Sequence, residues 1–202
     1  MSRTLTRSIA LVTCLAGVAV ADDATLHARS DATPGDQGIS AQMGLSGGGN
    51  LTPGGLRIDG HYLYQLSSQD WFDGVASFTY GGDSEGCYRD RMSTMVCNHG
   101  LTAGSAVEIA ATVRRMFASY GAFTPFARAG LGVSIVRYSA DDVSGFAIPL
   151  HAGGGVRVKV APAVAVVAQG EMTLGLGAYS HDLGAETLFG MAFTAGAEFD
   201  LR

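Results

Sequence analysis

The segment Phe189–Leu201, with the sequence FGMAFTAGAEFDL, decides the fold of this chain. Its apolar positions fall on every second residue: Phe189, Met191, Phe193, Ala195, Ala197, Phe199 and Leu201. Because successive side chains of a strand point to opposite faces, this period predicts a strand with one apolar face and one small or polar face. The segment is longer than the roughly 5 to 6 residues of an ordinary soluble strand and reaches the about 9 to 11 that cross a bilayer.

The same period recurs in seven other segments: 39–45, 56–66, 72–80, 107–113, 127–135, 148–160 and 164–176. The sequence therefore predicts an all-β fold, an eight-stranded antiparallel up-and-down barrel. Long connections at 47–55, 81–102, 139–145 and 179–186 alternate with short ones at 67–70, 118–123 and 161–162. This alternation is typical of outer-membrane barrels, which have short periplasmic turns and longer external loops.

Composition favours a membrane exterior over a soluble surface. The chain has 202 residues, of which 47% are hydrophobic and only 15% charged, whereas soluble domains average about 25% charged. No internal segment approaches the roughly 18 to 20 continuous apolar residues of a spanning helix. The formal net charge of −5 argues against a nucleic-acid partner.

The first residues indicate export. Arg3 and Arg7 precede the apolar stretch 9–20, which ends in Ala19-Val20-Ala21, the order of a cleaved signal peptide. We expect a signal peptide at 1–21, a flexible polar leader at 22–37 and the barrel at 38–202. A lipoprotein reading of Cys14 is the alternative, although the apolar run before it is short.

Cleavage at residue 21 leaves two cysteines, Cys87 and Cys97. An even count in an oxidising compartment makes them a candidate disulfide, with two reduced thiols as the alternative.

The size of the side chains indicates which face of the sheet is outside. An eight-stranded barrel encloses only enough space for side chains or one small ligand, and the aromatic face would overfill it. The opposite face is rich in glycine and carries nearly balanced charge, which we expect to pair because an unpaired buried charge is costly. The predicted lumen network comprises Arg57, Asp59, Glu108, Arg114, Arg128, Arg157, Lys159, Glu171, Glu198, Asp200 and Arg202.

Aromatic residues gather toward the ends of the expected strands, as in the interfacial girdles of membrane proteins. We expect Trp71, Phe72, Phe117, Tyr120 and Phe123 at the turn side. We expect Phe78, Tyr80, Tyr138, Phe146, Tyr179 and Phe189 at the loop side.

Three segments resemble the outer-membrane β-barrel domain of small OmpA- and OmpX-like proteins: 124–133 (TPFARAGLGV), 152–156 (AGGGV) and 195–199 (AGAEF). The resemblance implies a monomer in the cell outer membrane that contacts membrane lipid and lipopolysaccharide, is placed there by the barrel insertion machinery, and meets an extracellular ligand through its loops. Such barrels often end in an aromatic residue, whereas here Phe199 is followed by Asp200, Leu201 and Arg202.

No catalytic, metal or cofactor motif stands out. His61 and His151 fall on the predicted lumen face, either as proton-handling groups or as members of the network. Ser180, His181 and Asp182 are the residue types of a hydrolase catalytic triad. However, residues adjacent in sequence do not easily orient their side chains toward one another as nucleophile, base and orienting acid. Loop acids that could suggest Ca²⁺ match no EF-hand spacing; they are Asp83, Glu85, Asp90, Asp141 and Asp142.

The sequence thus predicts a small non-enzymatic outer-membrane barrel with an ion-pair-filled lumen, acting structurally or through its external loops and not as a wide pore. Two alternatives remain open: an outer-membrane lipid-modifying enzyme, and a soluble periplasmic lipocalin-like barrel that binds a ligand.

Overall fold

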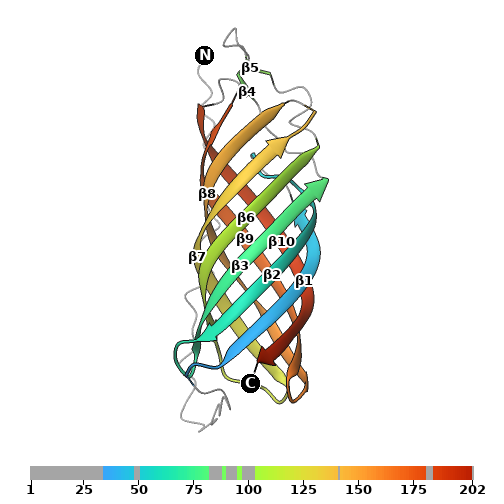
Figure 1. Cartoon of the computed structure of the whole chain (residues 1–202), viewed down its shortest axis with the longest axis vertical. Coiled ribbons are helices and arrows are strands. Elements are labelled where there is room, and N and C mark those ends of the chain that lie inside the picture. The colour runs from blue at the N-terminus through green and yellow to red at the C-terminus, as the bar shows by residue number, and fades with distance from the viewer. Residues whose placement is uncertain are drawn as a thin grey trace, which may run out of the picture.

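The computed structural model describes residues 34–47, 51–81, 88–89, 95–96, 103–140, 142–180 and 184–201. Eight antiparallel strands form a closed barrel (Figure 1): β1 (Gln37–Gly47), β2 (Gly55–Gln65), β3 (Asp70–Gly81), β6 (Gly104–Met116), β7 (Phe123–Tyr138), β8 (Val143–Ala161), β9 (Val164–Tyr179) and β10 (Gly184–Leu201). A separate two-stranded sheet pairs β4 (Tyr88–Arg89) with β5 (Met95–Val96). Within these ranges no helix is long and apolar enough to cross a membrane.

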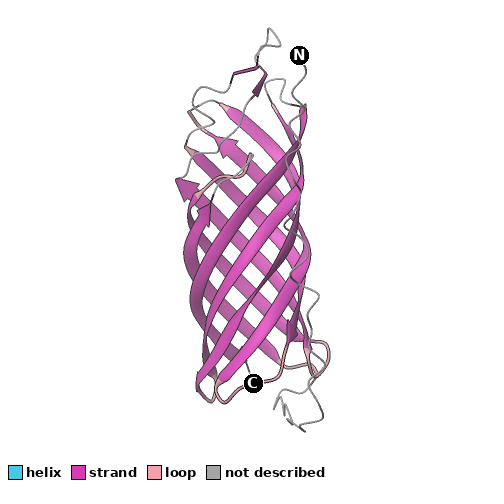
Figure 2. Ribbon diagram, turned by 180° about the vertical axis from the view of Figure 1, so that it is seen from behind, coloured by secondary structure: helices cyan, strands magenta, loops and turns pink. Residues whose placement is uncertain are grey.

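Each barrel strand pairs with its neighbours along the chain, and β10 pairs with β1 to close the ring, from Gln37–Leu201 to Gly47–Met191. The predicted all-β up-and-down barrel is confirmed. Connections 66–69, 117–122 and 162–163 lie together at one end, which we call the turn end, where β1 begins and β10 ends (Figure 2). The opposite end, which carries the other connections, is the loop end.

Two loop-end connections are shorter than expected. The ladder between β7 and β8 continues to the pair Tyr138–Val143, and that between β9 and β10 begins at Gly184–Tyr179. Strand pairing therefore extends into segments that lack a clear alternating pattern, and only residues 139–142 and 180–183 remain as connections. Gly184 has a φ of 67°, the left-handed conformation that glycine adopts without steric cost.

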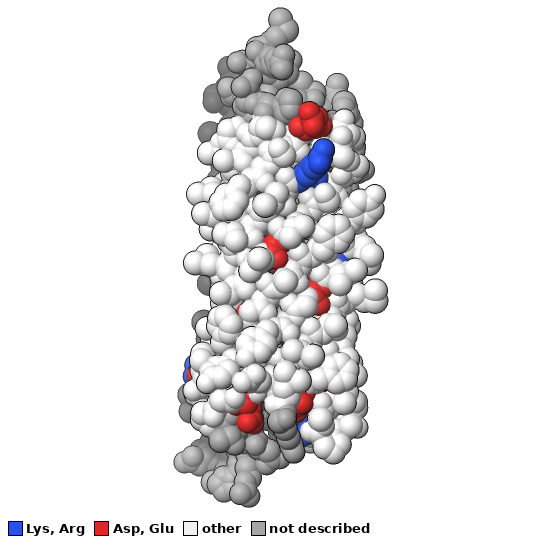
Figure 3. Space-filling view, in the orientation of Figure 1, with Lys and Arg blue, Asp and Glu red and all other residues white. Residues whose placement is uncertain are grey.

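The two faces of the sheet differ as the alternation predicts. Outward side chains are apolar and exposed, with Leu45 at 67% and Phe193 at 68%. Inward side chains are largely polar and buried, and Asp73 and Arg114 are fully inaccessible. Figure 3 shows an outer face composed mostly of uncharged residues. This arrangement contradicts the lipocalin-like alternative, which requires an apolar interior and a polar exterior.

Some inward glycines are required by close strand approach. A Cβ on Gly196 would lie 1.9 Å from the carbonyl oxygen of Ala41, and one on Gly44 would lie 1.9 Å from that of Phe193. Both glycines belong to the β1–β10 seam. The seam closes the barrel only because these two positions have no side chain.

Candidate functional site

The lumen holds a connected set of ion pairs that we call the lumen network. Its members are Arg57, Asp59, Asp73, Glu108, Arg114, Arg128, Arg157, Glu171, Glu198 and Asp200, contributed by every barrel strand except β1. Alternating strand geometry turns each of these side chains inward. The narrow lumen then places residues from opposite walls within contact distance.

The part of the network nearest the loop end is centred on Arg57. Its Nε donates to Asp59 Oδ1 at 2.8 Å. Its Nη2 lies 3.6 Å from Glu108 Oε1 and 3.4 Å from Glu171 Oε1. Arg57 thereby joins carboxylates of β2, β6 and β9 across the lumen.

The middle of the network is the most deeply buried. Arg128 Nη2 lies 3.1 Å from Glu171 Oε2, and Arg128 Nη1 lies 3.7 Å from Asp73 Oδ2. Arg114 donates to Asp73 Oδ2 at 3.1 Å and to Glu198 Oε2 at 2.8 Å. The Arg114 guanidinium also lies over the ring of Phe126, 4.6 Å from its centroid, a cation–π geometry.

Arg157 completes the network toward the turn end. Its Nε donates to Glu198 Oε1, and its Nη2 donates to Asp200 Oδ1 at 2.9 Å. Because Glu198 is shared by Arg157 and Arg114, the ion pairs run without interruption from Glu108 to Asp200.

The structure brings together nine of the eleven residues named from the sequence and leaves two aside. Lys159 has the inward parity but is exposed and forms no ion pair with a described residue. The physical reason is its position on the last part of β8, beside the turn at 162–163, where the main-chain N–H of Lys159 donates to Ala122 O. Arg202 lies outside the described residues.

Asp73 is the central residue that sequence reasoning missed. It is fully buried and lies against Arg114, Arg128 and His61, whose Nδ1 is 2.8 Å from Asp73 Oδ1. The sequence contained the information needed to find it. Phe72 lies on the outward face of this segment, so the next residue, Asp73, points inward, and an acidic side chain buried in the lumen requires a partner.

Both histidines of the lumen face lie against carboxylates. His151 Nδ1 is 3.0 Å from Glu171 Oε1, and His151 Nε2 is 3.2 Å from Glu108 Oε1. Thr173 Oγ1 lies 3.4 Å from the same Nδ1. The structure therefore places His151 and His61 within the electrostatic surroundings of the network.

The remaining chemical candidates fall mostly beyond what the structure describes. Cys87, Cys97, His181 and Asp182 lie outside the described residues, as do the signal peptide, Asp83, Glu85, Asp90 and Asp141. Asp142 is exposed at the loop end. Among the residues with described positions, no group of three His, Cys, Asp or Glu side chains is arranged to hold a metal ion.

Near the loop end lies an apolar cluster of Leu51, Val136, Tyr138, Val143 and Tyr179. Tyr138 and Tyr179 were expected in an outer girdle, but they are 0% and 7% exposed. The extended ladders place both at inward positions at the ends of β7 and β9. The Tyr179 hydroxyl donates to Leu51 O at 3.2 Å, which ties the segment after β1 into the barrel end.

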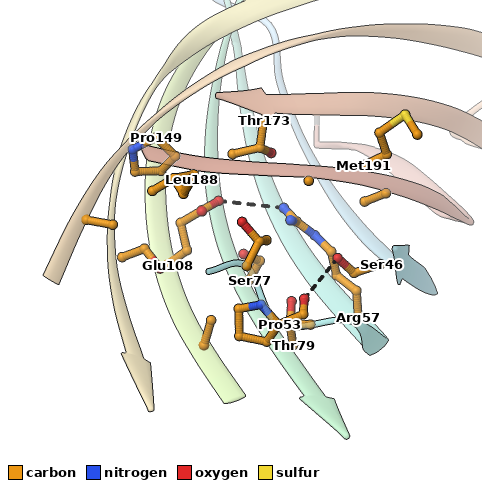
Figure 4. A pocket seen from close by; sticks show the side chains of 16 residues that line it. Ser46, Pro53, Arg57, Ser77, Thr79, Glu108, Pro149, Thr173, Leu188 and Met191 are labelled. Atoms are coloured by element: carbon orange, nitrogen blue, oxygen red, sulfur yellow. Dashed lines mark hydrogen bonds and ion pairs between the residues drawn. The ribbon is translucent and has the colours of Figure 1, made fainter. Parts of the chain in front are cut away.

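A small cavity of about 30 Å³ is lined by Arg57 and by Ala106, which packs against this apolar cluster (Figure 4). Ser77, Thr79 and Glu108 line one side, and Ser46 donates to the carbonyl of Pro53 at 3.3 Å on the other. A cavity of this size has room for water and for little else. The lumen network thus borders the cavity through Arg57 and Glu108.

Comparison with known proteins places the fold and nothing finer. No family model matches the chain, and no curated protein matches it. Among solved structures, Neisserial surface protein A (NspA) is 15% identical, with a TM-score of 0.52, over 84% of this chain and 98% of that one.

Two further solved structures are similar at lower scores. The attachment invasion locus protein Ail of Yersinia pestis, in complex with the heparin analogue sucrose octasulfate, is 14% identical over 83% of this chain and 100% of that one, with a TM-score of 0.48. The outer membrane protease OmpT of Escherichia coli is 10% identical over 84% and 98%, with a TM-score of 0.47. By its strand order and by its likeness to NspA, this chain has the fold of the outer-membrane β-barrels.

Proposed function

We propose that this protein is an exported, non-enzymatic outer-membrane barrel that stays closed to solutes and acts structurally or through its loop-end surface. The observation that supports this most is the lumen itself, which is filled from Glu108 to Asp200 by ion pairs and has the apolar cluster near its loop end. A barrel filled in this way has no aqueous channel of the kind that larger porins enclose.

The exterior supports the membrane location. Exposed side chains along the middle of the strands are aliphatic or aromatic, for example Ile109 at 65% and Ile135 at 64%. In water, such a surface would expose far more contiguous apolar area than monomeric soluble proteins do. In a bilayer the same surface is solvated by lipid, and the closed ring leaves no unpaired strand edge.

The connection lengths support an orientation with the turn end in the periplasm. The turn-end connections are short, whereas 48–54 and 82–103 at the loop end are the longest between barrel strands. Outer-membrane barrels have their longer loops outside the cell. We therefore expect surface interactions, such as adhesion to an extracellular ligand, to involve the loop end of a monomer.

Conductance tests the closed lumen. In planar bilayers, the refolded protein is expected to insert without large, steady conductance, because the ion pairs occupy the cross-section. Gel mobility before and after boiling should show in parallel that the sample is folded, since folded barrels resist SDS. A steady porin-like conductance from a heat-modifiable sample would overturn the closed-lumen proposal.

The processing of the chain is tested by intact mass. Protein purified from the outer membrane is expected to begin at Asp22 and to be two hydrogens lighter than the reduced form, because Cys87 and Cys97 are then bridged. Reduction and alkylation should add two labels. A Cys97→Ser variant is the control and should accept one label without reduction. Two labels on unreduced wild type would exclude the disulfide.

A further inference from the structure

The outer surface carries an apolar groove of about 830 Å³ across β2, β3, β6 and β7, bordered by Ile148 of β8. The outward residues at its base are small: Gly60 pairs with Ala76 across β2 and β3, and Gly74 pairs with Ala111 across β3 and β6. Larger apolar side chains surround them, namely Tyr62, Phe72, Ile109, Leu131, Val133 and Ile148. The small residues thus leave a hollow in an otherwise bulky apolar surface.

Exposed apolar side chains of the β6–β7 pair, Val107 and Ile135, lie between the groove and the loop end. Ala111 pairs with Leu131 and Ile109 with Val133 inside the groove, and the same ladder reaches Arg137. From Val133 to Arg137 the strand rises by about 13 Å, at about 3.3 Å per residue. A lane of apolar side chains therefore connects the groove to one cation near the edge of the apolar surface.

Arg137 is placed to meet an anion at that edge. It is exposed, has the outward parity of β7, and forms no ion pair with any residue whose position is described. Its cross-strand neighbours are Ser105 on β6 and Ser144 on β8. The Ser105 hydroxyl donates to the main-chain carbonyl oxygen of Arg137 at 3.4 Å, whereas Ser144 is exposed. An exposed guanidinium, with the Ser144 hydroxyl on the neighbouring strand, suits the oxygens of a phosphate.

We propose that the groove and Arg137 together bind one phosphate-bearing lipid of the external leaflet, with an acyl chain in the groove and the phosphate at the guanidinium. This rests on the proposed membrane location. In a bilayer, an apolar hollow excludes water, and hydrocarbon fills it because an empty hollow forfeits dispersion contacts. The surface is apolar within the groove and cationic at Arg137, so it favours an anionic acyl lipid over a zwitterionic one.

Native mass spectrometry of the full chain refolded in detergent tests the site, with phosphatidic acid and phosphatidylcholine of identical acyl chains as probes. The wild type is expected to retain one phosphatidic acid in preference to phosphatidylcholine. Arg137→Gln should weaken phosphatidic acid binding about tenfold, the effect of losing one charge-assisted contact, and abolish the preference. Ala111→Phe should fill the groove and weaken retention of both lipids.

Matched controls separate the site from general effects. Ala168→Phe adds the same bulk at an exposed position of β9 away from the groove, and Arg115→Gln removes an exposed cation at the turn end. Both should retain lipid as the wild type does. If Ala111→Phe fails to refold, Ala76→Leu fills the same hollow with a smaller side chain.

These measurements distinguish failure of the lipid site from failure of the proposed membrane barrel. A sample without heat-modifiable mobility contradicts the membrane barrel itself. A folded sample that binds both lipids equally, or whose retention is unchanged by Arg137→Gln or by the groove-filling variants, overturns the lipid site alone. A doubled mass that Ala111→Phe abolishes would show that a second copy covers the groove, and would also overturn it.

Discussion

Replacing Arg114 with methionine is expected to lower the free energy of unfolding by about 3–5 kcal/mol, the usual effect of removing one partner of a buried ion pair. Arg114 is fully buried and donates to both Asp73 and Glu198. Without it, Asp73 retains His61 and a more distant Arg128, while Glu198 retains only Arg157 among described ion-pair partners. Urea unfolding of the protein in lipid vesicles measures the loss.

Arg115→Met is the matched control for Arg114→Met. Arg115 is the next residue on β6, but its side chain is 58% exposed and its ion pair with Asp70 is at the surface. Surface pairs contribute about 0–1 kcal/mol, so the control should change stability little. Adding Asp73→Asn and Glu198→Gln to Arg114→Met should recover part of the loss. Equal effects of the two methionine variants would show that the network does not stabilise the barrel.

Gly196→Ala is expected to destabilise the barrel by about 1–3 kcal/mol, toward the upper end, or to prevent its closure. The added Cβ would lie 1.9 Å from the carbonyl oxygen of Ala41 and 2.6 Å from the Cα of Gln42. These are backbone atoms of the facing strand, so only separation of β1 from β10 relieves the overlap. Loss of heat-modifiable mobility and a lower unfolding midpoint are the measurements.

Gly60→Ala is the control for the seam variant. Gly60 is also a strand glycine, but it faces outward, and its added Cβ would have its nearest atom, the carbonyl oxygen of Ala76, at 3.9 Å. This is ordinary van der Waals contact, and stability should stay near that of the wild type. If Gly196→Ala folds as well as Gly60→Ala, the seam does not require glycine at position 196.

The strands and their faces could be predicted from the sequence because both depend on a local rule. In a segment such as β10, each residue has the parity opposite to that of its neighbour, so the position of Phe193 determines that Thr194 points inward. The same rule assigned Arg57, Glu108 and Glu171 to the lumen. Large aromatic residues then favoured an outward apolar face, and the exposed apolar and buried polar side chains of the structure excluded the alternative in which the apolar face lines the barrel.

The rule fails at strand ends, where hydrogen bonding to the partner strand, and not the alternation of apolar residues, decides how far a strand extends. Residue type and approximate position predicted Tyr138 and Tyr179 in an outer girdle. Ladder pairs with Val143 and Gly145 continue β7 and β9 to these residues at inward parity. The outcome depends on the partner strands, and composition near a strand end does not reveal it.

By itself, the sequence determined that the chain forms long amphipathic strands, which residues they present to each face, and that the inward face is charged. Only the tertiary structure decided which charges meet. Arg114 and Glu198 are 84 residues apart and lie on β6 and β10, which do not pair with each other. Their contact follows from the curvature and stagger of a closed ring, because these bring opposite walls together, and alternation along one strand carries no information about that distance.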